Sequence, residues 1–213
     1  MALDRAIDLL RESNNPFLVD TLRIKARWYG EKARWQEALA CYSELAQINE
    51  LDGNKEFYAR DLLSIADCCN ELGNWSEVIT HCLKAWEIFK EEKMLFEISW
   101  CKLNIADAHA ELGEGEKAIF WGRKANDIAV IRKDNEMICK SNYVMAKGYK
   151  VLGKYTDAEI LLLASQDLVA RTNDYTQITK VEKELISIYR LTERNTEADE
   201  AERRLLTLNE VVQ

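Results

Sequence analysis

Three stretches of the chain repeat one pattern: LGNWSEVITHCLKAWEI (72–88), LGEGEKAIFWGRKANDI (112–128) and LGKYTDAEILLLASQDL (152–168). Each begins with a Leu-Gly pair and carries a small apolar residue six positions later, at Val78, Ala118 and Ala158. The interval between the stretches is constant, and self-similarity at a fixed period of about 40 residues is typical of helical repeat arrays.

The same spacing extends over most of the chain. Small residues recur at Ala26, Ala66, Ala106 and Ala146, and Ile186 takes the fifth place. A glycine after leucine can adopt the left-handed conformation that ends a helix, and small residues let two helices approach closely. The sequence therefore predicts pairs of helices, each pair divided by a tight turn and each covering the apolar face of the next.

These repeats predict an all-α fold, a right-handed α-solenoid of about eleven helices, in a single domain over 1–213. A half repeat at 1–16 precedes full repeats at about 17–56, 57–96, 97–136, 137–176 and 177–213. We expect first helices near 18–31, 57–72, 97–112, 137–152 and 177–192, and second helices near 35–51, 75–91, 115–132, 155–171 and 195–209. A repeat array normally starts with a complete pair or a special cap, so the half repeat suggests that the chain begins within a larger ancestral architecture.

Composition excludes several classes of protein. The net charge of −8 argues against a nucleic-acid binder, although the stretch from Lys140 to Arg190 carries a local basic stripe. No apolar run approaches the roughly 20 residues that span a bilayer. Six cysteines inside helical patterns favour reduced thiols in a cytoplasmic protein.

The cysteines and histidines of the second and third repeats do not show the paired spacing of a zinc site. We interpret them as core residues and expect no metal and no cofactor. No nucleophile with a nearby base is recognisable, so we expect no enzyme activity.

The quoted stretches resemble the tetratricopeptide repeat family, whose common period of about 34 residues is lengthened here by about six. The resemblance implies a concave groove lined by first helices, which would bind a peptide or protein segment. Its candidate residues are Arg23, Arg27, Arg60, Asp67, Asn70, Trp100, Asn104, Asp107, Lys140, Tyr143 and Lys147. The alternative is an ordinary solvated face without a ligand.

Two of these residues have a specific expected role. Asn104 stands where some peptide-binding members carry an asparagine that bonds the main chain of the ligand, because an amide can donate and accept at once. Trp100, one turn away, could pack an apolar ligand side chain or pack against a neighbouring helix. The basic clamp of members that bind chaperone C-termini is matched only at Asn104 and Lys140, which argues against a co-chaperone.

The long repeat period is also similar to that of bacterial regulators of the Rap, NprR and PlcR type, which implies a regulatory domain that holds a signalling peptide. The alternative is a scaffold or adaptor that holds a segment of a larger protein. A homodimer stays open: Trp28, Trp86 and Trp121 could form an oligomer contact or pack between the lengthened helices, and we favour packing.

Overall fold

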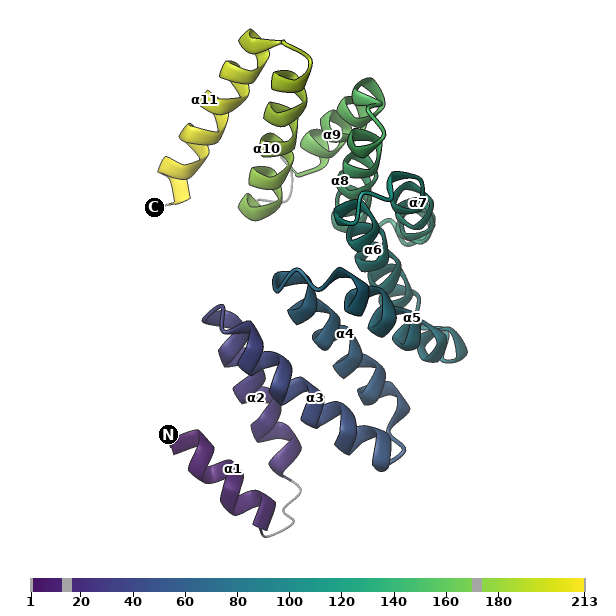
Figure 1. Cartoon of the computed structure of the whole chain (residues 1–213), viewed down its shortest axis with the longest axis vertical. Helices are drawn as coiled ribbons and strands as arrows, with labels where there is room; N and C mark the ends of the chain where they lie inside the picture. The colour runs from purple at the N-terminus through teal and green to yellow at the C-terminus, as the bar shows by residue number, and fades with distance from the viewer. Residues whose placement is uncertain (1, 13–16, 170–173, 213) are drawn as a thin grey trace. The chain divides into compact units, whose positions relative to one another are not determined.

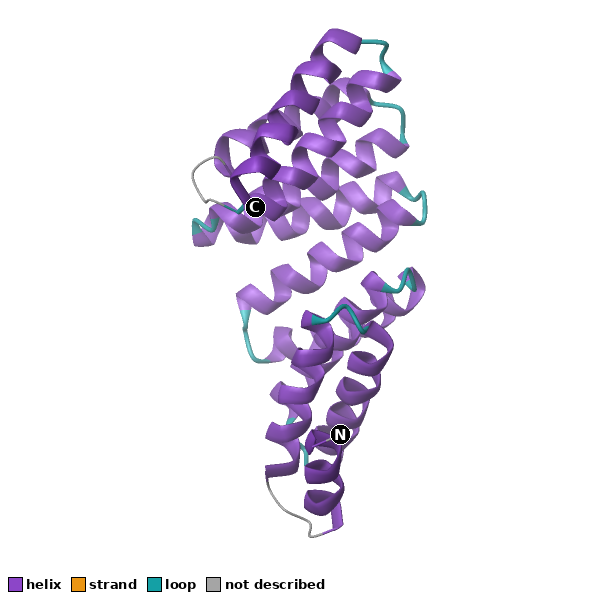
Figure 2. Ribbon diagram, turned by 90° about the vertical axis from the view of Figure 1, so that its left-hand side faces the viewer, coloured by secondary structure: helices purple, strands orange, loops and turns teal. Residues whose placement is uncertain are grey.

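The computed structural model describes residues 2–12, 17–169 and 174–212, and all regular structure in these ranges is helical (Figures 1 and 2). The helices of these ranges are α1 (Ala2–Glu12), α2 (Phe17–Glu31), α3 (Trp35–Leu51), α4 (Lys55–Glu71), α5 (Trp75–Glu91), α6 (Leu95–Glu111), α7 (Gly115–Arg132), α8 (Asn135–Val151), α9 (Tyr155–Val169), α10 (Tyr175–Leu191) and α11 (Asn195–Val212). The predicted all-α class is confirmed.

The first helices of repeats two to five begin slightly earlier than predicted, for example at Lys55 in α4. The residues before two of these helices explain the early start. The carboxylates of Asp134 and Asp174 each accept a hydrogen bond of 3.0 Å from a backbone N–H in the first turn of the helix. Such N-caps satisfy donors that have no partner within the helix.

A left-handed residue lies just after each of the helices α2 to α8 and α10, and successive ones are 20 or 40 positions apart. Positive φ angles between 53° and 76° occur at Ala33, Gly53, Gly73, Lys93, Gly113, Lys133, Gly153 and Glu193. At Gly73, for example, the N–H of Asn74 bonds the carbonyl of Cys69 at 2.8 Å, which is the Schellman pattern. One helix and its turn therefore occupy half of a repeat, and this explains the constant period of the sequence.

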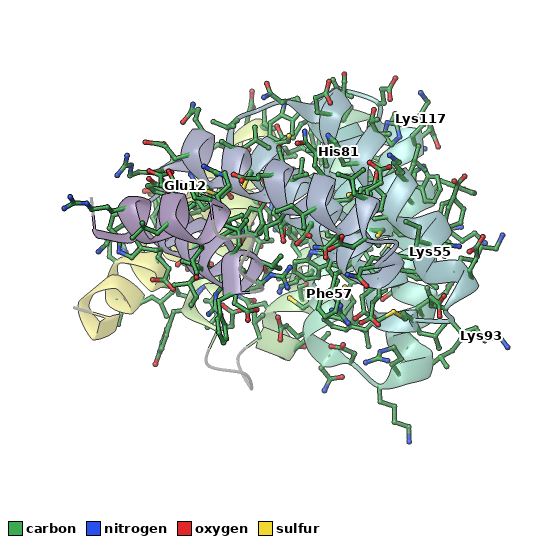
Figure 3. All side chains as sticks on the ribbon, turned by 90° about the horizontal axis from the view of Figure 1, so that it is seen from below. Glu12, Lys55, Phe57, His81, Lys93 and Lys117 are labelled. Atoms are coloured by element: carbon green, nitrogen blue, oxygen red, sulfur yellow. The ribbon has the colours of Figure 1, made fainter. Side chains whose placement is uncertain are left out.

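Half of these positions, namely Ala33, Lys93, Lys133 and Glu193, are not glycine. Left-handed geometry costs a residue with a Cβ about 1–2 kcal/mol. The exposed side chain of Lys93 points away from the helices, so nothing beyond the backbone is strained there (Figure 3).

The small residues of the repeat form the contacts between helices, as predicted. Ala26, Ala66, Ala106 and Ala146 are no more than 1% exposed. α7 and α8 approach closely, because a Cβ on Gly115 would lie 2.6 Å from a backbone oxygen of α8. Only small residues permit such close packing.

The contacts divide the chain into two compact units, Met1–Asn104 and Ile105–Gln213, with the boundary inside α6. Ile7, Leu22 and Leu45 form one core cluster in unit 1. In unit 2 a core cluster includes Leu162 and Leu185. The predicted single domain stays a prediction.

No helix in the described ranges is long and apolar enough to cross a membrane.

Candidate functional site

The predicted site residues lie on the first helices, and we describe them unit by unit. We call the side formed by α2, α4 and residues 95–104 of α6 the first-helix face of unit 1. In unit 2 this face is formed by residues 105–111 of α6, α8 and α10. Unit 1 carries Arg23, Arg27, Arg60, Asp67, Asn70, Trp100 and Asn104, whereas unit 2 carries Asp107, Lys140, Tyr143 and Lys147.

Polar side chains in unit 1 link neighbouring first helices. Arg60 of α4 forms an ion pair with Glu97 of α6 at 2.9 Å. The amide of Asn104 donates to Asp67 at 2.9 Å. In both pairs the two partners lie 37 positions apart in the sequence, which is one 40-residue repeat less about one helical turn. The partners therefore face each other across adjacent first helices.

One predicted site residue, Arg23, is the partner of a buried carboxylate. Asp61 is 2% exposed, and it accepts a hydrogen bond of 2.6 Å from Asn49. Burial raises the pKa of Asp61, while the bond from Asn49 and the charge of Arg23 oppose that shift. Arg23 lies 3.3 Å from this carboxylate, so its charge stabilises a buried anion of unit 1.

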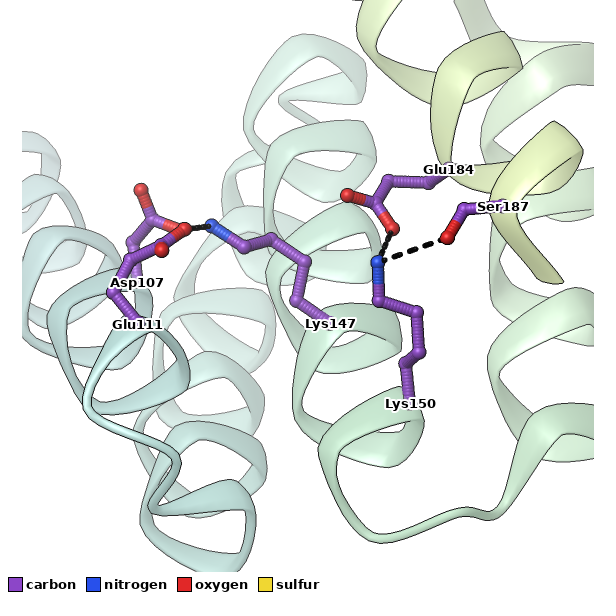
Figure 4. A network of polar contacts seen from close by, with 6 residues as sticks. All are labelled: Asp107, Glu111, Lys147, Lys150, Glu184 and Ser187. Atoms are coloured by element: carbon purple, nitrogen blue, oxygen red, sulfur yellow. Dashed lines mark hydrogen bonds and ion pairs between the residues drawn. The ribbon is translucent and has the colours of Figure 1, made fainter. Parts of the chain in front are cut away.

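The same kind of linkage occurs in unit 2 (Figure 4). Lys147 of α8 lies 2.5 Å from both Asp107 and Glu111 of α6. Lys150 pairs with Glu184 of α10. Burial alone would lower the pKa of Lys147, but its two carboxylate partners raise it above the ordinary value. Lys147 is therefore held as a cation.

The other two predicted residues of unit 2 are also engaged. The ring of Tyr143 lies 5.8 Å from the Lys147 ammonium, and burial raises the pKa of Tyr143 to about 12. Lys140 pairs with Glu136 of its own helix at 2.5 Å. A charged ligand would have to displace existing partners on this face of unit 2, so it would gain little net energy there.

Unit 1 contains a pocket of about 240 Å³ between α2, α3 and α4. It is lined by Arg27, Gly30, Glu31, Trp35, Ala38, Tyr42, Ser64, Asp67 and Cys68. The pocket brings together two predicted site residues, the exposed Arg27 and Asp67. Asn70 does not line this pocket, although it lies three residues after Asp67 on α4; its Oδ1 atom is buried and has no hydrogen-bond partner within the described ranges. Acceptors, a cation and an aromatic wall thus converge on one small hollow.

Aromatic side chains form a second feature of the first-helix face of unit 1. Phe57 and Phe96 are 48% and 43% exposed. Phe96 stacks on Trp100 with ring centroids 6.4 Å apart, and the guanidinium of Arg23 lies 5.3 Å from the centre of Phe57. Phe96 and Trp100 form a stacked pair on α6, and Phe57 of α4 lies beside Arg23 of α2.

Trp100 was predicted from the sequence, whereas Phe57 and Phe96 were not. A helical-spacing signal could have found them. Phe57 and Arg60 are spaced i, i+3, and Phe96 and Trp100 are spaced i, i+4, so each phenylalanine shares a face with a residue already predicted.

All six cysteines are buried, as the core interpretation predicts. Burial raises the pKa of Cys68 and of Cys101 to about 12, so neither thiol is a nucleophile near neutral pH. Within the described ranges, no group of three or more His, Cys, Asp or Glu residues is placed to hold a metal ion.

Repeated helix pairs, left-handed turns and buried small residues together define the tetratricopeptide-type fold of α-solenoids. Solved structures of proteins of this class superpose on the chain. One is a Rap protein complexed with competence and sporulation factor, which has a TM-score of 0.80 and 16% sequence identity. The match covers 97% of this chain and 62% of the Rap protein, so the chain spans less than two thirds of that protein's length.

Two other structures are similar at comparable identity. RapI in its apo form has a TM-score of 0.74 at 14% identity, with 99% of this chain and 90% of RapI covered. A putative kinesin light chain from Podospora anserina, with nearly identical TPR-like repeats, has a TM-score of 0.68 at 17% identity over 93% of this chain and 98% of its own. Identities this low show the shared fold alone. No protein-family model and no curated protein matches the sequence.

Proposed function

We propose that the chain is a peptide-binding regulatory domain, which holds its ligand on the first-helix face and acts by binding, without catalysis. The observation that carries this proposal is the pocket of unit 1 lined by Arg27 and Asp67. A hollow that combines an apolar wall with a few convergent polar groups is the usual form of a ligand site. A Rap protein of similar fold is complexed with competence and sporulation factor, and the resemblance of the repeats to Rap-type regulators implies a peptide as the ligand.

A second candidate function is a scaffold that holds a segment of a larger protein. The similarity to the kinesin light chain repeats favours it. The linked polar side chains of unit 2 favour it too, because a face whose charges are already paired needs no small charged ligand. The size of the bound partner separates the two functions.

Affinity capture tests the proposal. The full chain serves as bait in an extract of the cells that produce it, and bound material is released by mild acid and analysed by mass spectrometry. We expect a short peptide on the wild-type bait and none on Arg27→Glu. Arg123→Glu is the matched control, because Arg123 is also exposed but lies on the second helix α7.

Two results would contradict the proposal. Equal capture of the same peptide by Arg27→Glu would remove the pocket from the site. Recovery of a large protein in place of a peptide would establish the scaffold function. A homodimer stays a separate prediction; Trp28 is 45% exposed, and sedimentation of the wild-type chain would detect self-association.

A further inference from the structure

Unit 2 contains a pocket that the proposed function does not use. It has a volume of about 270 Å³ and is lined by side chains of the second helices α7 and α9 and of α8. We propose that this pocket binds a single α-amino acid with an apolar side chain. The inference goes beyond the proposed function, because none of the predicted peptide-binding residues lines this pocket.

The polar lining of the pocket consists of one cation, one carboxylate and one amide. Arg123 and Asn126 lie about one turn apart on α7, and Asp157 comes from the first turn of α9. Arg123 and Asp157 are exposed, and within the described ranges neither side chain forms a hydrogen bond or an ion pair. The Oδ1 atom of Asn126 is buried and likewise has no partner there. All three groups are therefore available to a ligand.

Other cations of unit 2 are already engaged. Arg194 pairs with Glu159 at 2.6 Å, and Arg204 pairs with Glu182 at 3.0 Å. An anionic group that binds Arg123 gains a charge-assisted hydrogen bond without displacing such a partner. A buried acceptor without a partner is also unfavourable, so a donor from the ligand at the amide oxygen of the pocket adds to the gain.

Apolar side chains form the rest of the lining. Met145 and Tyr149 lie one turn apart on α8, and Ile160 and Leu161 lie on α9. Met145 packs closely against α7, because a Cβ on Gly122 would lie 2.7 Å from its Cγ atom. Ile160 is 60% exposed, so a ligand that covers it removes apolar surface from water. This part of the pocket suits an aliphatic or aromatic side chain.

An α-amino acid with an apolar side chain carries the groups that this lining would recognise. Its carboxylate accepts from the guanidinium of Arg123, and its ammonium group donates to the carboxylate of Asp157 and to Oδ1 of Asn126. Its side chain packs on Ile160. Pockets for drug-sized ligands usually have volumes of about 300–1,000 Å³, so a pocket of about 270 Å³ suits one amino acid better than a long peptide.

Calorimetric titration of the full chain tests the inference, with L-leucine, L-methionine and L-phenylalanine as separate probes. We expect at least one of them to bind saturably, with one site per chain. The amide of that amino acid lacks the carboxylate, and its N-acetyl derivative lacks the ammonium charge. Each derivative should bind at least about tenfold more weakly, because each loses a hydrogen bond between charged groups.

Substitutions place the bound amino acid in the pocket. Arg123→Gln and Asp157→Asn should each weaken its affinity at least about tenfold, for the same reason. Arg203→Gln is the matched control, because Arg203 is also an exposed arginine of unit 2 but lies on α11 and does not line the pocket. It should leave the affinity unchanged. All three side chains are exposed, so the variants should fold, and circular dichroism checks this before binding is measured.

The outcomes are separate from those for peptide binding. Absence of saturable binding by all three amino acids would overturn the inference and leave the proposed function in place. Equal affinity of the wild type, Arg123→Gln and Asp157→Asn would overturn it too, because the amino acid would then bind elsewhere. An equal loss with Arg203→Gln would have the same consequence. In the capture experiment, Arg123→Glu should still retain the peptide, since that peptide does not depend on this pocket.

Discussion

Replacing Lys147 with methionine tests the linkage of first helices in unit 2. Methionine keeps much of the side-chain volume but leaves Asp107 and Glu111 without their shared cation. Breaking a fully buried pair costs about 3–5 kcal/mol, and an exposed pair contributes about 0.2–1 kcal/mol. The side chain of Lys147 is 13% exposed and its partners 24% and 38%, so this site lies between the two limits. We expect the free energy of unfolding to fall by about 2 kcal/mol.

The assay is urea unfolding of the full chain followed by circular dichroism. Lys55→Met is the control, because Lys55 pairs with Glu91 at 3.9 Å and both side chains are 70% exposed. It should change the free energy of unfolding by less than about 0.5 kcal/mol. A loss for Lys147→Met as small as that of the control would refute the reasoning.

The dependence on pH gives a second check on Lys147. Its pKa is raised above the ordinary value of 10.5 in the folded state. The stabilisation is therefore complete below that ordinary value and is lost as the pH rises through the raised folded-state value. The difference between wild type and Lys147→Met should be the same at about pH 7 and about pH 9. A difference that shrinks over this range would contradict the assignment.

Three further predictions concern packing, turns and thiols. Gly115→Ala should destabilise the chain by about 1–3 kcal/mol in urea unfolding, because the new Cβ would lie 2.6 Å from a backbone oxygen. Gly30→Ala is the control and should not destabilise the chain, because its Cβ would lie 3.4 Å from the nearest atom. Lys133→Gly should stabilise by about 0.5–1 kcal/mol, since its φ of 56° suits glycine, and an unchanged urea midpoint would count against this. Burial raises the pKa values of Cys68 and Cys101 to about 12, so a chromogenic disulfide reagent at about pH 8 should not react with either thiol until urea is added. Prompt reaction of these thiols in the folded chain would contradict their burial.

The repeat architecture was readable from the sequence because its determinants are local. Gly73 ends a helix by its own backbone freedom, and Ala66 and Ala106 recur because helices in contact need small residues at the same place in every repeat. The left-handed turn at Lys133 was hidden, since a lysine there carries no compositional signal. It is recognisable only from its position midway between Gly113 and Gly153.

The sequence predicts which helices carry the candidate residues, but it does not predict which of their side chains form ion pairs. The period placed Asp107 and Lys147 on the same face, yet it did not show that the two side chains bind each other. Which neighbour a long side chain reaches depends on the offset between helices and on its rotamer, and neither is encoded by spacing alone. For the same reason, the repeat period does not distinguish the paired charges of unit 2 from the pocket at Arg27.

A crystal structure of the full chain with a bound peptide tests the central claim most directly. We predict that the peptide lies on the first helices α2, α4 and the start of α6, in contact with Arg27 and Asp67. A peptide bound instead along the second helices α3 and α5, with both of these side chains untouched, would contradict the account.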